Sequence, residues 1–310
     1  MIERLTEFLT QKPTKGRRAV FLILALAVTV AVLGWLVWSQ RDVIPTIDWQ
    51  IRPQFFLLSM LAYAAALVIV ALVWSSILSA FGSQVAPLKN ILYFLITNVG
   101  KRLPGTVWYV AWRAQIYHQE NYPVALTSLA SSVELAVLIV SGVMVGLGFM
   151  AQQLQKIELG LWVLGLIGAA CIALLHPRVL SAIIRKLSKV EVRISYSKIL
   201  GWIAVYLVVW VLGGISLFCI ANGFIAVPIG ALPFVVESWA AVGVLSFMLL
   251  FLPTNLGFNE IGLSFLLTQV MPSPIAVVVA LASRVLTTIY DILIALIAFG
   301  VESRQKNGDL

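Results

Sequence analysis

The sequence predicts an all-α polytopic membrane protein in which six spanning helices and two re-entrant helical hairpins form an inverted-topology repeat. Three observations predict this fold. The 310 residues are 61% hydrophobic and only 11% charged, with a mean hydropathy of +1.01, and soluble domains do not have this balance. Apolar runs of spanning length recur along the chain, and two further apolar regions are interrupted at their centres. We therefore expect a single transmembrane domain over residues 1–310.

Six apolar runs are long enough to span a bilayer, which takes roughly 20 residues. They cover about 19–39, 55–78, 123–150, 159–176, 199–221 and 275–300. The interrupted regions, about 88–118 and 232–270, contain LPG at 103–105 and LPTN at 252–255. A re-entrant hairpin that enters and leaves on the same side explains each region. The alternative interpretation is a pair of amphipathic helices lying in the headgroup layer.

The distribution of cations orients these segments. With the N-terminus in the cytoplasm, fourteen of the 21 Lys and Arg residues lie on the cytoplasmic side, and only Arg41, Arg52 and Lys156 lie outside. This bias satisfies the positive-inside rule only if both interrupted regions return to the side from which they entered. We therefore expect a protein of the plasma (inner) membrane with both termini in the cytoplasm. The net charge of +8 follows from this topology, so no nucleic acid is expected as a partner.

The order span, span, hairpin, span occurs twice, over 19–150 and 159–300. Because each half has three spans, the second half is inverted relative to the first, an arrangement typical of secondary transporters. LPGT at 103–106 parallels LPTN at 252–255 in the corresponding hairpin. The predicted turn residues at the two hairpin tips are Pro104, Gly105, Thr106, Pro253, Asn255 and Gly257.

Eight charged residues remain inside the apolar regions. The cations are Lys101, Arg102, Arg113 and Arg284, and the carboxylates are Glu134, Glu237, Glu260 and Asp291. Each costs about 2.5–3.5 kcal/mol at a helix centre, so these side chains should face a cavity or one another. We expect Glu134, Glu260 and Asp291 to act as charge partners of the cations or to couple transport to protons. The alternative is that internal salt bridges merely fix the packing of the helices.

The first hairpin has the features of an anion site. A helix that begins near Thr106 presents free backbone N–H groups and its positive dipole end. Lys101 and Arg102 lie immediately before it, and Arg113 lies two turns along it. This combination favours an anion, especially a phosphate. The second hairpin offers Glu260 at the corresponding helix start, to pair with Arg284 or with a cationic group of a substrate.

Residues 98–105, NVGKRLPG, followed by Val107, Trp108 and Arg113, resemble the GKYxPGxVW…GR element of the lysylphosphatidylglycerol synthase transmembrane family. Members include the N-terminal flippase domain of the multiple peptide resistance factor. Residues 252–260, LPTNLGFNE, resemble the second element of that family, PGGLGVRE, and Arg284 lies where the family tends to carry an arginine. The resemblance implies translocation of a lipid with a phosphate-bearing headgroup.

Two departures from the family pattern concern the headgroup. Thr254-Asn255 replaces the Gly-Gly pair, and Asn259 replaces the arginine before the glutamate. Because the chain ends ten residues after the last predicted span, aminoacyl transfer to lipid is not expected. No catalytic motif is found either, so we do not expect an enzyme.

The expected function is that of a lipid flippase or scramblase-like transporter. Lys101, Arg102 and Arg113 would hold the phosphate of a phospholipid or polyprenyl-phosphate lipid, with Arg284 assisting. Two alternatives stay open: a transporter or channel for a small soluble anion, and a non-transporting accessory subunit of a membrane lipid or glycan synthesis enzyme. The expected partner is a lipid with an anionic headgroup, and the sequence also permits a homo-oligomer or a complex with such an enzyme. No cofactor or metal is expected.

Overall fold

The computed structural model describes residues 49–102, 107–156, 194–248 and 257–306, and a few single positions besides. Within these ranges the ordered elements are helices, with no strand. Five of the described helical segments are long and apolar enough to cross a membrane. The chain is therefore an α-helical polytopic membrane protein. Apart from single positions, the predicted spans at about 19–39 and 159–176 lie outside the described residues.

Four predicted spans coincide with helices of the structure. These are α3 (Pro53–Ala80), α6 (Val124–Lys156), α9 (Tyr196–Phe224) and α12 (Ser273–Lys306). The fifth segment of spanning length, Ile229–Phe247, differs from the prediction, because the sequence assigned it to the first arm of the second hairpin. Pro233 lies in the first turn of this arm, where a missing N–H breaks no helical bond, so the apolar run continues as one long helix.

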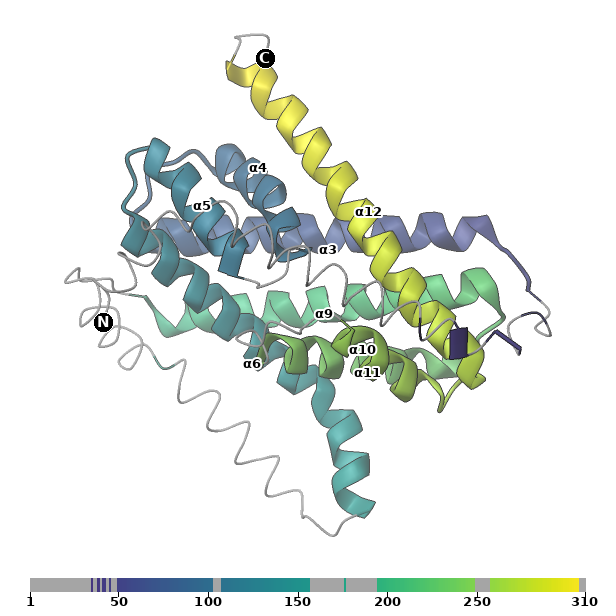
Figure 1. The fold of residues 1–310 in the computed structure, drawn as a ribbon. Coiled ribbons are helices and arrows are strands. Elements are labelled where there is room, and N and C mark those ends of the chain that lie inside the picture. The colour runs from purple at the N-terminus through teal and green to yellow at the C-terminus, as the bar shows by residue number, and fades with distance from the viewer. Residues whose placement is uncertain are drawn as a thin grey trace.

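Helices α3 and α9 lie side by side and antiparallel (Figure 1). At one end, the backbone N–H of Arg52 donates to the carbonyl oxygen of Gly223 at 2.9 Å. At the other end, Trp202 Nε1 donates to Ser76 Oγ at 3.0 Å. Contacts at both ends fix this pair as the frame against which both hairpins pack.

The first interrupted region is an antiparallel helix pair. It consists of α4 (Pro87–Asn98), the short 3-10 helix η2 (Val99–Arg102) and α5 (Val107–Gln119). At the base, Lys89 Nζ lies 3.1 Å from Glu120 Oε1. Nearer the tip, Arg113 Nε donates to Thr97 Oγ1 at 3.4 Å. The start of α4 therefore lies beside the end of α5, over nearly the same residues as the predicted hairpin at 88–118.

The second interrupted region is also an antiparallel pair. It consists of the 3-10 helix η3 (Ile229–Ala231), α10 (Leu232–Met248) and α11 (Phe258–Leu267). Ser246 Oγ donates to Asn259 Oδ1 near the tip. Further from the tip, a Cβ on Gly262 would lie 3.2 Å from Val242 Cγ2. The end of α10 therefore packs against the start of α11.

The two hairpins approach from opposite ends of the α3–α9 pair (Figure 1). Helix α4 begins beside the C-terminal part of α3, where Asn90 Nδ2 donates to Ser75 Oγ at 3.3 Å, and the following η2 reaches Tyr63, near the middle of α3. Helix α10 begins beside the C-terminal part of α9, where Gly214 contacts Val236. Since α3 and α9 are antiparallel, their C-termini lie at opposite ends, and the two helix pairs extend toward each other.

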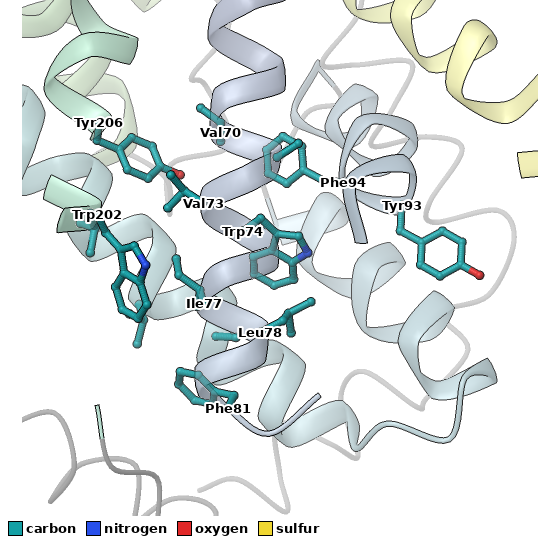
Figure 2. Close-up of a cluster of buried hydrophobic side chains, with 14 of the residues drawn as sticks. Val70, Val73, Trp74, Ile77, Leu78, Phe81, Tyr93, Phe94, Trp202 and Tyr206 are labelled. Carbon is teal, nitrogen blue, oxygen red and sulfur yellow. The ribbon is translucent and has the colours of Figure 1, made fainter. Parts of the chain in front are cut away.

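Buried side chains of α3 tie the first hairpin to α9 (Figure 2). The α3 residues are Val70, Val73, Trp74, Ile77, Leu78 and Phe81, with Tyr93 and Phe94 of α4 on one side and Trp202 and Tyr206 of α9 on the other. Trp74 of α3 also makes a hydrogen bond to the first hairpin, since its Nε1 donates to the hydroxyl of Tyr117 in α5 at 3.0 Å. The first hairpin is therefore fixed to the frame by both apolar packing and hydrogen bonds.

Candidate functional site

A cavity of about 250 Å³ lies between the end of α4 with η2, the hairpin helices α10 and α11, and the long helices α3, α9 and α12. Trp210, Trp239 and other apolar side chains form much of its wall. Its polar lining consists of Tyr63, Asn98, Lys101, Arg102, Tyr206, Ser246, Asn259, Glu260, Ser283, Arg284, Thr287 and Asp291. Residues from both halves of the chain therefore meet at one cavity.

Asp291 of α12 holds the tip of the first hairpin. Its Oδ2 lies 2.5 Å from Arg102 Nε, and its Oδ1 accepts hydrogen bonds from Asn98 Nδ2 and Tyr63 OH, both at 3.0 Å. Arg102 donates a second time, to Tyr63 OH at 2.8 Å. Charge-assisted hydrogen bonds are stronger than neutral ones, so this network fixes Arg102 in one position.

Glu134 of α6 joins two other predicted cations. Its Oε2 lies 2.5 Å from Arg113 NH1, and its Oε1 accepts a hydrogen bond from Tyr206 OH at 3.3 Å. Lys101 Nζ lies 4.0 Å from the same Oε1. That separation is too long for a hydrogen bond, so charge alone links Lys101 to Glu134. Lys101 is therefore held far more loosely than Arg113.

Arg113 lies behind the cavity and not in its lining. Its guanidinium carbon lies 4.1 Å from the ring centroid of Trp74 and 4.6 Å from that of Phe94, and its side chain is fully buried. This position differs from the expected contact with a substrate phosphate, because aromatic rings and Glu134 already enclose the guanidinium. Arg113 instead neutralises and positions Glu134.

Arg284 of α12 faces Glu260 of α11. Arg284 Nε lies 3.6 Å from Glu260 Oε1, which is longer than the Arg102–Asp291 pair by more than 1 Å. Glu260 lies in the first turn of α11, where the positive end of the helix dipole favours a carboxylate. Its second oxygen, Oε2, is buried with no hydrogen-bond partner in the described part of the chain.

In each ion pair at the cavity, the cation is the accessible member. The exposed fractions of the cation side chains are 19% for Lys101, 18% for Arg102 and 22% for Arg284, against 2% for Glu134, 2% for Asp291 and 3% for Glu260. The lining itself contains three basic side chains, Lys101, Arg102 and Arg284, and two acidic ones, Glu260 and Asp291. The cluster therefore presents an excess of positive charge to the cavity.

Most of the predicted turn residues lie outside the described residues: Pro104, Gly105, Thr106, Pro253 and Asn255. Gly257 is described, and it precedes α11 with a φ of +91°. That left-handed conformation strains residues with a Cβ, so glycine suits the start of this helix. Helix α5 is described from Val107, so the predicted helix start near Thr106 lies outside the described residues.

Sequence reasoning missed the two tyrosines of the cavity lining. Tyr63 and Tyr206 each donate to a buried carboxylate. Their local sequence does not distinguish them from tyrosines that anchor spanning helices at the interface. Asn98 carries a clearer signal, since a buried amide in an apolar helix needs a partner, and it lies directly before the Gly-Lys-Arg stretch.

The chemistry that this arrangement supports is electrostatic binding of an anion. Among the described residues, no group of three or more His, Cys, Asp and Glu side chains is placed to hold a metal ion. No protein-family model and no curated protein sequence matches the chain. The resemblance to the lysylphosphatidylglycerol synthase transmembrane family therefore rests on the two short stretches alone.

Proposed function

We propose that the protein moves a lipid with a phosphate-bearing headgroup between the leaflets of a bilayer, as a flippase or scramblase-like transporter. The observation that carries this proposal is the placement of Lys101, Arg102 and Arg284 around one cavity between two opposed hairpins. Charges inside a membrane mark substrate pathways more often than they serve packing alone. An excess of cations in a low-dielectric cavity attracts a phosphate strongly.

The opposed hairpins support an inverted repeat of residues 19–150 and 159–300 as part of this proposal. Each hairpin follows a long helix of its half, α3 or α9, and starts beside that helix's C-terminus. Broken helices that meet near the midplane are typical of secondary transporters. The excess of Lys and Arg on one side of the predicted spans gives the orientation that we propose: both termini lie in the cytoplasm, with the helices in the plasma (inner) membrane.

The cavity volume supports a headgroup as the bound part of the lipid. Sites for drug-sized ligands measure about 300–1,000 Å³, so a cavity of about 250 Å³ accommodates a polar headgroup and leaves the acyl chains outside. Lys101 and Arg284 are the cations with long contacts to their carboxylates, 4.0 Å and 3.6 Å. These two exchange a carboxylate for the phosphate, whereas Arg102 stays bound to Asp291.

A transporter or channel for a small soluble anion is the second candidate, favoured by the same small volume. The accessory-subunit alternative is weaker, because it requires the polar residues to be paired and closed off from any cavity. The cations here are paired and yet 18–22% exposed toward a cavity. A transport assay therefore separates the remaining candidates.

The test is reconstitution into vesicles that contain labelled phosphatidylglycerol, phosphatidylethanolamine, phosphatidylcholine or a polyprenyl phosphate. We expect leaflet exchange above that of protein-free vesicles for at least one lipid, and a loss of about tenfold or more in Arg284→Gln, since a tenfold loss needs only about 1.4 kcal/mol. Lys89→Gln is the matched control, because Lys89 pairs with Glu120 at the base of the hairpin, away from the cavity. Exchange equal to that of empty vesicles for every lipid overturns the proposal, and efflux of trapped inorganic phosphate instead supports the soluble-anion candidate.

A further inference from the structure

Glu260 differs from the other two carboxylates of the cluster. Both oxygens of Asp291 and both oxygens of Glu134 have hydrogen-bond partners. Glu260 is buried to the same extent, yet its Oε1 faces Arg284 at 3.6 Å and its Oε2 has no partner among the described residues. Buried polar atoms are nearly always hydrogen-bonded, so this oxygen points to a donor that a ligand would supply.

The neighbouring side chains leave this position to a ligand. Asn259 Oδ1 accepts a hydrogen bond from Ser246, Arg284 Nε lies 3.6 Å from the other oxygen of Glu260, and no described side chain bonds to Oε2. Both Glu260 and Arg284 line the cavity. The cation of Arg284 and the carboxylate of Glu260 therefore lie next to each other in the cavity lining.

We infer that the Arg284–Glu260 pair is a two-part headgroup subsite, in which Arg284 binds the phosphate and Glu260 Oε2 accepts a hydrogen bond from the headgroup. This inference rests on the proposed function and narrows its substrate class. The preferred lipids carry an N–H or O–H donor beyond the phosphate, as ethanolamine and glycerol headgroups do. A choline headgroup has a positive charge but no donor, so it leaves the buried oxygen unsatisfied.

The first experiment compares leaflet exchange of phosphatidylethanolamine, phosphatidylglycerol and phosphatidylcholine. For the unaltered protein we expect the two donor-bearing lipids to exceed phosphatidylcholine by on the order of tenfold, the effect of leaving one buried acceptor without a donor. Glu260→Leu should bring all three rates to a common value. Glu260→Gln keeps one acceptor oxygen without the charge, so it should lower the phosphatidylethanolamine rate while the phosphatidylglycerol preference persists.

The matched control is Glu120→Gln, which removes a carboxylate at the base of the first hairpin and should leave the selectivity unchanged. If Glu260→Leu does not fold, the exchange rates of Glu260→Gln alone test the subsite. An unchanged ratio of phosphatidylethanolamine to phosphatidylcholine in Glu260→Gln overturns the subsite, as does the absence of any preference in the unaltered protein.

A binding measurement in detergent separates the subsite from transport itself. The probes are dihexanoyl-phosphatidylethanolamine, dihexanoyl-phosphatidylcholine, and the free esters phosphoethanolamine and phosphocholine. If vesicles show no exchange but the ethanolamine probes bind about tenfold more tightly than the choline probes, the transport proposal fails and the subsite stands. Equal affinities overturn the subsite. Free phosphoethanolamine binding as tightly as the dihexanoyl lipid makes a soluble ester the ligand, which supports the subsite and contradicts a lipid substrate.

Discussion

The two hairpins differ in the contacts that add to their apolar packing. The first hairpin makes two short ion pairs: Arg113 pairs with Glu134 of α6, and Arg102 pairs with Asp291 of α12. Both carboxylates are almost fully buried. Breaking such a pair leaves an uncompensated charge in a low-dielectric interior, so the first hairpin has essentially one position in which it satisfies its partners.

The second hairpin depends on close contact. A Cβ on Gly213 would come within 2.3 Å of Trp239 Nε1, and a Cβ on Gly214 within 2.5 Å of the Cα of Val236. Small residues let membrane helices approach closely and gain dispersion energy. The ion pair that this hairpin makes in the described part of the chain, Glu260–Arg284, is long. Among the described contacts, the first hairpin therefore makes two short ion pairs, whereas the second makes one long ion pair and packs closely through glycines.

The largest effect is expected when a buried charge of the first hairpin loses its partner. Arg113→Ala should lower the free energy of unfolding by about 3–5 kcal/mol, because Glu134 would stay buried without its closest cation. Unfolding by a denaturing detergent, followed by circular dichroism, measures this change. The double variant Arg113→Met with Glu134→Leu removes both charges and should recover much of the stability. A double variant no more stable than Arg113→Ala would contradict the role given to this pair.

A smaller loss is expected from crowding the second hairpin. Gly214→Ala should lower the free energy of unfolding by about 1–3 kcal/mol, the usual cost of overpacking, because the added methyl group meets the backbone of Val236. Gly201→Ala is a matched control in the same helix, since a Cβ there meets nothing within 4 Å. The same unfolding assay applies, and equal stabilities of the two variants would show that close packing does not hold α10.

The smallest effect is expected at the base of the first hairpin. Lys89 is 38% exposed and pairs with Glu120, and exposed ion pairs contribute about 0.2–1 kcal/mol. Lys89→Ala should therefore reduce the free energy of unfolding by no more than that, and less in high salt because of screening. If Lys89→Ala lowered the free energy of unfolding as much as Arg113→Ala does, the contacts at the base of the first hairpin would contribute most to its stability, and not the buried ion pairs.

Much of the helical framework could be predicted from the sequence because it depends on local properties. Uninterrupted apolar runs and the length of a bilayer predicted α3, α6, α9 and α12. The length of α10 was not predicted, because an apolar segment before a break reads equally well as a half-membrane arm or as a span. The cost of burying charge indicated which residues need partners, but not which partner each one takes.

The sequence by itself determined that this protein is a bundle of membrane helices with charged residues inside, because hydropathy and the cost of buried charge act on each residue wherever it lies. Only the tertiary structure decided that Arg102 meets Asp291, 189 residues away, and that Arg113 is enclosed by Trp74 and Phe94 instead of facing the cavity. Such pairings depend on how helices from distant parts of the chain pack, because the geometry of several helices together sets which charges come within reach of one another.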